Sequence, residues 1–276
     1  MGTEPGEAAG PLRRRGWLAL LAMAIGLIGA GTGWRVWSRP ATPVPPDLTP
    51  RPGDLDGHAA VRVGFIGDSI TEGYGSDRPP SESFRDALAD LPGGVAVVNR
   101  AVGGSSTADW LPGRRTFDEA ERAFERAKVR YVVVTLGIND ARGHRPAAEF
   151  RANLAAIVAA LTKAGDRVVL NLPPAHEPGR SSRWADAETL ALLRSYLPEI
   201  RSLTDGRGVL LGDTAAFDYF RDHPELLRDG VHPGPAGAAF LGRRWAAAFR
   251  AVLDRERDDR AAGKGGGRDG EGHENP

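Results

Sequence analysis

Four short segments of this sequence carry side chains that could perform acyl transfer. They are residues 67–73 with Gly-Asp-Ser, 99–105 with an asparagine before two glycines, 137–140 with Gly-x-Asn-Asp, and 229–233 with Asp-x-x-His. Together they supply a hydroxyl, a base, an orienting carboxylate and donors for an oxyanion. Because a serine hydroxyl is a poor nucleophile until an imidazole takes its proton, the pattern points to a serine with a histidine partner.

Each segment alone also has a purely structural explanation, which is the better one for a single occurrence. A Ser-x-x-Glu pair is a capping box, paired glycines make tight turns, and an asparagine after a strand forms an Asx-turn. A histidine before a proline can lie on the surface, near an aspartate that caps a helix. The residues concerned are, in that order, Ser69 with Glu72, Gly103-Gly104, Asn139-Asp140, and His232 with Asp229. Their joint occurrence in one chain favours an active site.

The elements that must position these segments alternate regularly along the chain. Buried strands are expected at Val61 to Ile66, Val95 to Val98, Tyr131 to Leu136, Arg167 to Leu172 and Val209 to Leu211. Helical patterns cover Ser83 to Leu91, Phe117 to Lys128, Glu149 to Lys163, Trp184 to Leu203 and Ala236 to Leu253. The alternation predicts a parallel sheet with helices on both faces and a ligand crevice beyond the carboxyl ends of its strands. The four segments follow strands, so we expect them to meet there.

In combination, the four segments resemble the SGNH, or GDSL, hydrolases. That family carries Gly-Asp-Ser, Asn-x-x-x-x-Gly, Gly-x-Asn-Asp and a C-terminal Asp-x-x-His in this order, and the resemblance covers Val61 to Phe249. It implies an α/β fold: a three-layer α/β/α sandwich around a five-stranded parallel sheet of flavodoxin-like order. It also implies hydrolysis of carboxylic esters through an acyl-serine intermediate, without a cofactor.

The resemblance assigns a role to each matching residue. Ser69 becomes the nucleophile, His232 the base, and Asp229 its partner, which can reach the imidazole Nδ1–H within one turn. The backbone N–H groups of Ser69 and Gly104 and the side-chain amide of Asn139 become the donors to the oxyanion.

The same comparison selects Gly104 and two supporting residues. The family glycine stands five places after the asparagine, which is Asn99 here, and this count favours Gly104 over Gly103. Asp68 is expected to hold the loop around Ser69 by hydrogen bonds, and Asp140 to do the same near Asn139.

The remaining histidines are weaker candidates. His58 and His273 fall in the expected linker and tail, whereas His144 and His176 fall in loops on the crevice side, where a surface role is favoured over substrate contact. His223 competes for the role of base but lacks the Asp-x-x-His spacing. No compact group of His, Asp and Glu has the spacing of a zinc or calcium site, so we expect no metal.

The N-terminal segment suggests a location outside the cytoplasmic membrane. Three arginines, Arg13 to Arg15, precede an uncharged stretch from Trp17 to Trp34, which would span about 27 Å as a helix. With Trp37 beyond it, the pattern favours a retained single-pass anchor with an extracytoplasmic catalytic domain. The alternatives are a cleaved signal peptide, which gives a secreted protein, and a buried helix.

Composition sets the domain boundaries and excludes several functions. We expect an anchor or signal segment at 1–38, a proline-rich linker at 39–60, the hydrolase domain at 61–253, and a disordered charged, glycine-rich tail at 254–276. Lysine plus arginine balance aspartate plus glutamate at 36 each, which argues against nucleic acid as a partner. The absence of cysteine excludes disulfides, thiolate metal sites and cysteine nucleophiles.

The expected substrate is an acyl ester of a small molecule, a glycan or a lipid, and envelope glycans or lipids are favoured by the predicted location. Two alternatives stay open. An acyltransferase would use the same triad with an alcohol other than water as acceptor. An anchored binding protein would keep the fold without turnover.

Overall fold

The computed structural model describes the backbone of residues 61–180 and 185–265, with side chains as far as residue 258. Within these ranges, no helix has both the length and the apolar character required to cross a bilayer. The predicted membrane segment 1–38, the linker 39–60, His58 and His273 lie outside the described residues, so what the sequence indicates for them stays a prediction.

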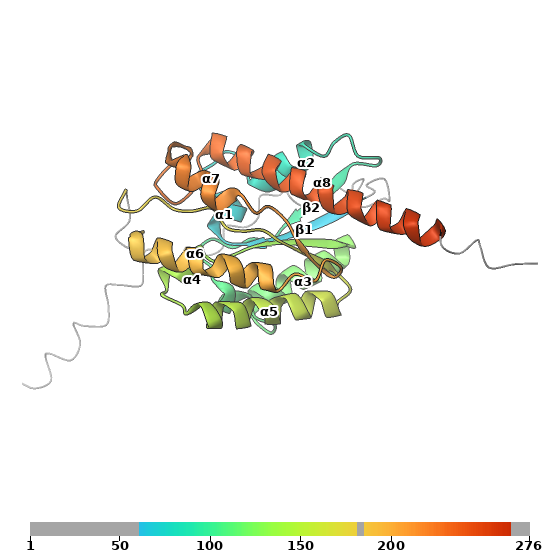
Figure 1. The fold of residues 1–276 in the computed structure, drawn as a ribbon, viewed down its shortest axis with the longest axis horizontal. Helices are drawn as coiled ribbons and strands as arrows, with labels where there is room; N and C mark the ends of the chain where they lie inside the picture. Colours follow the sequence, from blue (N-terminus) through green and yellow to red (C-terminus); the bar gives the residue numbers. More distant parts are fainter. Residues whose placement is uncertain (1–60, 181–184, 266–276) are drawn as a thin grey trace, which may run out of the picture. The chain divides into compact units, whose positions relative to one another are not determined.

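A five-stranded parallel sheet forms the middle of the domain (Figure 1). Its order is β2-β1-β3-β4-β5, which is the flavodoxin-like order and confirms the predicted fold class. The valine-rich strand sequences suit this position, because helices cover both faces of the sheet. The strands are β1 (Val61–Gly67), β2 (Val95–Asn99), β3 (Tyr131–Thr135), β4 (Arg167–Leu170) and β5 (Val209–Leu211).

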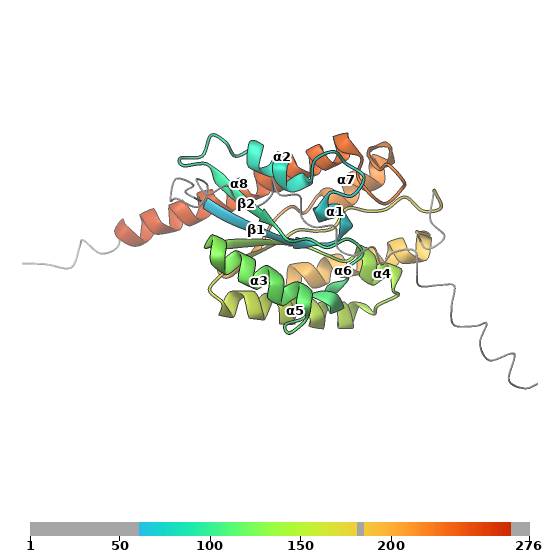
Figure 2. The same cartoon turned by 180° about the vertical axis from the view of Figure 1, so that it is seen from behind.

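Helices cover the sheet on both faces and complete three layers. One face carries α2 (Pro80–Asp86), α7 (Ala216–Asp222) and α8 (Pro235–Gly265). The opposite face, which lies below the sheet in Figures 1 and 2, carries α3 (Arg115–Ala127), α5 (Ala147–Lys163) and α6 (Ala187–Ser202). Short helices follow the strand ends and loops: α1 (Ser69–Glu72), η3 (Thr107–Trp110), α4 (Ile138–Arg142) and η4 (Pro224–Leu226).

Aromatic side chains fill the space between the sheet and its two helical layers. On one face Phe65 of β1 packs edge-on against Phe84 of α2, with ring centroids 5.1 Å apart. On the other face the rings of Phe150 and Tyr196 stack at 4.1 Å and join α5 to α6. Helices α2 and α8 approach closely at Gly242, where a Cβ atom would lie 2.2 Å from the carbonyl oxygen of Pro80. There is no room for a side chain at this position, so glycine is required.

Helix α8 extends beyond the boundary predicted at residue 253. It continues to Gly265, so the segment predicted as a disordered tail begins inside a helix. The physical reason lies at Glu256, which is only 8 % exposed. Its carboxylate accepts a hydrogen bond from the Tyr131 hydroxyl at 2.7 Å and pairs with Arg167 at 2.8 Å. Contacts to two strands thus hold this part of the helix, which the local charged sequence did not indicate.

Candidate active site

The four segments singled out in the sequence meet at the carboxyl-terminal edge of the sheet. Ser69 follows β1, Gly104 follows β2, and Asn139 follows β3 at the start of α4. Asp229 and His232 lie in the loop between η4 and α8. This is the edge at which a doubly wound sheet opens its ligand crevice.

Ser69 occupies the first position of α1, and its hydroxyl faces the imidazole of His232. The distance from Ser69 Oγ to His232 Nε2 is 2.9 Å. The helix cap is Asp68 rather than Ser69, because Oδ1 of Asp68 accepts the N–H of Ile70 at 2.9 Å. The capping-box explanation of Ser69 and Glu72 is therefore wrong, and the Ser69 hydroxyl is available to the imidazole.

Asp229 orients His232 from within the same loop. Its Oδ2 lies 2.8 Å from the His232 Nδ1, while its Oδ1 accepts the backbone N–H groups of His232 at 2.8 Å and Val231 at 3.0 Å. Partial burial would raise the pKa of Asp229, but the hydrogen bonds and charge of His232 and the N–H of Val231 outweigh it and lower that pKa. Asp229 is thus an anionic partner for the imidazole and does not cap α8.

A loop after β2 borders the serine on its other side. Its ends are held to β1, since Val102 N–H and the Ser105 hydroxyl both donate to the carbonyl oxygen of Gly67, at 3.0 and 3.2 Å. Between them Gly104 has a φ of +78°, a conformation that favours glycine. A Cβ atom on Gly103 would lie 3.7 Å from the Cβ of Ser69, so this loop passes directly beside the serine.

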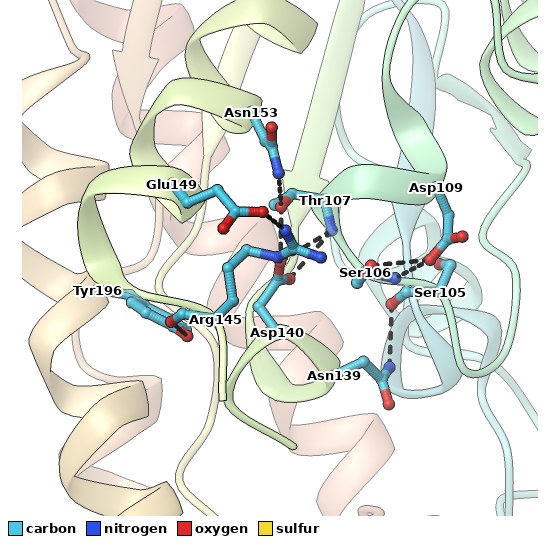
Figure 3. A network of polar contacts seen from close by, with 10 residues as sticks. All are labelled: Ser105, Ser106, Thr107, Asp109, Asn139, Asp140, Arg145, Glu149, Asn153 and Tyr196. Carbon is cyan, nitrogen blue, oxygen red and sulfur yellow. Dashed lines mark hydrogen bonds and ion pairs between the residues drawn. The ribbon is translucent and has the colours of Figure 1, made fainter. Parts of the chain in front are cut away.

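Asn139 is fixed to the same loop. Its Nδ2 donates to the carbonyl oxygen of Ser105 at 3.0 Å, as Figure 3 shows. The predicted oxyanion donors Gly104 and Asn139 therefore belong to segments that contact each other, next to Ser69.

Asp140, the neighbour of Asn139 in the sequence, ties α4 to η3 (Figure 3). It is fully buried, accepts the Thr107 hydroxyl at 2.6 Å and backbone N–H at 3.0 Å, and pairs with Arg145 at 2.7 Å. Arg145 also pairs with Glu149, and its carbonyl oxygen accepts the hydroxyl of Tyr196 at 2.5 Å. Burial raises the pKa of Asp140, although the hydrogen bonds of Thr107 and the charge of Arg145 oppose the rise. The Asx-turn explanation is wrong for Asp140, since its carboxylate joins α4 to η3.

Comparison with known proteins agrees with this geometry. Residues 65–240 match the model of the GDSL-like lipase/acylhydrolase family. The chain belongs to this family. It is accordingly a carboxylic ester hydrolase. No curated protein is matched by the chain.

Solved structures share the fold of this GDSL-like acylhydrolase. Axe2, an acetylxylan esterase from Geobacillus stearothermophilus, is 20% identical with a TM-score of 0.54, and the match covers 71% of this chain and 94% of that one. LAE5, an alpha/beta hydrolase enzyme from the metagenome of Lake Arreo in Spain, is 24% identical with a TM-score of 0.53, covering 70% and 95%.

The other histidines of the acylhydrolase lie in different settings. His176 is buried against Thr189, with 3.3 Å between its Nε2 and the hydroxyl oxygen, and burial lowers its pKa. His223 is exposed and contacts Glu225, and His144 lies exposed in the loop after α4. Among the described residues, no group of three or more His, Asp or Glu side chains could hold a metal ion.

Several residues around the site escaped the sequence analysis. Thr107 begins η3 and Arg145 lies in the loop after α4, and both hold Asp140, but no local sequence pattern marks either residue for this role. In the sequence, Asn99 served only to identify Gly104 as the glycine five places after it. In the structure its Nδ2 donates to the carbonyl oxygen of Thr71 at 2.8 Å, tying the end of β2 to α1. Tyr74 was also missed; its ring lies 4.6 Å from that of His232.

Proposed function

We propose that this acylhydrolase cleaves acyl esters through a covalent intermediate on Ser69. The observation that carries the proposal is the 2.9 Å contact between Ser69 Oγ and His232 Nε2, with Asp229 on the other ring nitrogen. His232 takes the hydroxyl proton as Oγ attacks the ester carbonyl. It then returns that proton to the departing alcohol. Water, deprotonated by the same imidazole, releases the acid and restores the serine.

The negative charge of each tetrahedral intermediate falls on the former carbonyl oxygen. The N–H groups of Ser69 and Gly104 and the amide of Asn139 are the proposed donors to it. An asparagine amide carries two hydrogens. One of them is engaged by the carbonyl oxygen of Ser105, which fixes the plane of the amide and leaves the other for the substrate. The amide of Asn139 is thus oriented before substrate binds.

We further propose that the substrate is an acyl ester of a carbohydrate. In the described part of the chain, Tyr74 is the large apolar side chain that stands exposed, at 44%, and its ring is tilted against His232. Because His232 protonates the leaving alcohol, the alcohol part of the ester would lie beside this ring. An exposed aromatic face suits the C–H surface of a sugar. The similar solved esterase from Geobacillus stearothermophilus is described as acting on acetylxylan.

The proposed location is outside the cytoplasmic membrane, where envelope glycans would carry the ester. Its support is the arginine-flanked apolar segment from Trp17 to Trp34. Fractionation of cells that produce the full chain tests it: the protein should be found in the membrane fraction and be cleaved by protease added outside. Protection from that protease would contradict the proposal.

The decisive activity test is a p-nitrophenyl ester series from acetate upward, with wild type and Ser69→Ala. We expect fast turnover of short esters that disappears in the variant. Undiminished turnover by Ser69→Ala would refute the acyl-serine route.

Acetylated xylan and an acyl phospholipid, assayed side by side, then show whether the alcohol part of the ester is a sugar or a lipid. Product analysis with sugar acceptors present separates hydrolysis, which releases free acid, from acyl transfer.

A further inference from the structure

Glu72 lies on the same short helix as Ser69 and has no role in the proposed chemistry. Because Asp68 is the N-cap of α1, the third helical position belongs to Thr71, so Glu72 does not act in a capping box. Its carboxylate instead contacts the loop after β2. It accepts a hydrogen bond from the backbone of Gly103, and a Cβ atom on Gly103 would lie 2.6 Å from its Oε2.

The contact falls at the middle of the loop that carries the predicted oxyanion donor. The ends of this loop are fixed by the bonds from Val102 and Ser105 to Gly67. Its centre is the pair Gly103-Gly104, which has no side chain to pack; a Cβ atom on Gly104 would meet nothing within 4 Å. Two adjacent glycines are the most flexible backbone a loop can have. Within the loop, the Ser105 N–H donates to the carbonyl oxygen of Val102 at 3.2 Å and closes a turn around the two glycines, and Glu72 adds a contact to this turn from outside the loop.

We propose that Glu72 is a positioning residue, whose carboxylate holds Gly103 so that the N–H of Gly104 stays directed at the ester oxygen beside Ser69. Helix α1 then carries both the nucleophile Ser69 and the residue that holds the loop after β2, so the positions of the serine and of this loop are fixed relative to each other. This inference rests on the proposed acyl-serine mechanism. Glu72 touches no reacting atom and acts through the backbone.

The surroundings of Glu72 indicate that an acceptor, rather than a negative charge, is what the loop requires. The side chain is partly buried, and burial raises its pKa, against the effect of the Gly103 hydrogen bond. The nearby Asp68 carboxylate interacts with it unfavourably. A neutral amide of the same shape could accept the same N–H, which makes Glu72→Gln an informative variant.

The test compares Glu72→Ala, Glu72→Gln and the control Glu82→Ala on p-nitrophenyl acetate. Glu82 lies on the neighbouring helix α2 in an exposed pair with Arg78. We expect Glu72→Ala to lower kcat about 10- to 100-fold at nearly constant KM, less than the loss of a whole donor, because the N–H is misplaced but present. Glu72→Gln and Glu82→Ala should stay close to wild type. Unchanged kcat in Glu72→Ala, with its fold verified by circular dichroism, would overturn the proposal.

Inhibition by phenylboronic acid separates positioning from a general structural role. Boronic acids form a tetrahedral adduct with a catalytic serine and thus use the oxyanion donors, as a transition-state analogue does. The inhibition constant should rise in Glu72→Ala by about the same factor by which kcat falls, and remain unchanged in Glu72→Gln. A lower kcat with unaltered boronate affinity would show that the oxyanion loop is still in place, and would refute the inference.

A double-mutant cycle tests whether Glu72 and Gly103 act through direct contact. In Gly103→Ala the new methyl group meets the Glu72 carboxylate, whereas in the Glu72→Ala background that obstacle is gone. The loss of kcat caused by Gly103→Ala should therefore be smaller in the second background. Equal losses would contradict a direct link. Failure of the mechanism itself would appear separately, as activity that survives Ser69→Ala.

Discussion

The two sides of the candidate site are held in place by different means. The base side is local: the carboxylate oxygens of Asp229 bind the ring of His232 and two backbone N–H groups, all within four consecutive residues. The oxyanion side is assembled from distant segments. Asn139 binds Ser105, 34 residues away, and Asp140 binds Thr107, 33 residues away. A short turn thus orients the base, whereas the correct sheet must form before the oxyanion donors are oriented.

This difference predicts how each side responds to damage. A substitution on the base side removes a chemical group and leaves its surroundings intact. A substitution in the network behind Asn139 leaves all chemical groups present and misplaces them. The first kind should affect turnover alone, and the second should affect turnover and stability together.

The largest effect should come from removing the nucleophile or the base. We expect Ser69→Ala and His232→Ala each to lower kcat by a factor on the order of a million, because the two act as a unit. For the same reason the double variant should be no worse than either single one. Steady-state and single-turnover rates on p-nitrophenyl acetate measure this. Losses that multiply in the double variant would contradict a shared step.

A smaller effect is expected for Asn139→Ala. Loss of one oxyanion donor typically lowers kcat about 100- to 1,000-fold, which corresponds to about 2.7–4 kcal/mol of transition-state stabilisation. The thermal unfolding midpoint should change little, since the side chain makes one hydrogen bond to the protein, to Ser105. An unchanged kcat would remove Asn139 from the oxyanion hole.

Thr107→Val probes the network that only the tertiary structure assembles. It removes the 2.6 Å bond from the hydroxyl to the buried Asp140 carboxylate and the 3.2 Å bond that the hydroxyl accepts from Asn153 Nδ2, while keeping the shape of the side chain and the backbone N–H. We expect unfolding to become easier by about 1.5–3 kcal/mol, the usual worth of a hydrogen bond to a charged group. Turnover should fall about tenfold, through a looser Asn139. Urea denaturation and kcat provide the measurement, both compared with Thr116→Val, where the lost hydroxyl donates to the carbonyl oxygen of Asp109 instead of to a buried carboxylate. Lower activity without lower stability would contradict the comparison.

Asp68→Asn should have the least effect on turnover and a pH-dependent effect on stability. Burial raises the pKa of Asp68 from 3.8 to about 7, against the hydrogen bond from Ile70 and aided by the charge of Asp140. The folded state therefore holds this proton more strongly than the unfolded state. Its contribution to stability is complete below pH about 4 and is lost as pH rises through about 7.

An asparagine at this position can still accept the N–H of Ile70 as the N-cap of α1, but its side chain cannot ionise. Between pH 4 and 8 the stability of Asp68→Asn should accordingly rise relative to wild type, by up to about 4 kcal/mol. Urea denaturation of both proteins across this range measures the difference. A difference that does not change with pH would show that Asp68 titrates normally in the folded protein.

Much of the fold could be predicted because its signals are local. The runs such as Tyr131 to Leu136 are mostly apolar, as suits strands buried on both faces, and all five strands appear close to the predicted places. The ends of the helices differ from the predicted ones. Helix α2 begins at Pro80, where proline suits the first turn, rather than at the predicted Ser83. The length of α8 depended on Glu256 reaching Arg167 and Tyr131, which no local pattern reveals.

The sequence by itself determined which reactive side chains this protein has and which strand each of them follows. Ser69, Asn139, Asp229 and His232 could be named because motif spacing and strand alternation are written in consecutive residues. Only the tertiary structure decided which distant segments the side chains join: Glu72 reaches Gly103, and Thr107 holds Asp140. Hydrogen bonds act over about 3 Å, so such partnerships depend on how the folded sheet brings separate loops together.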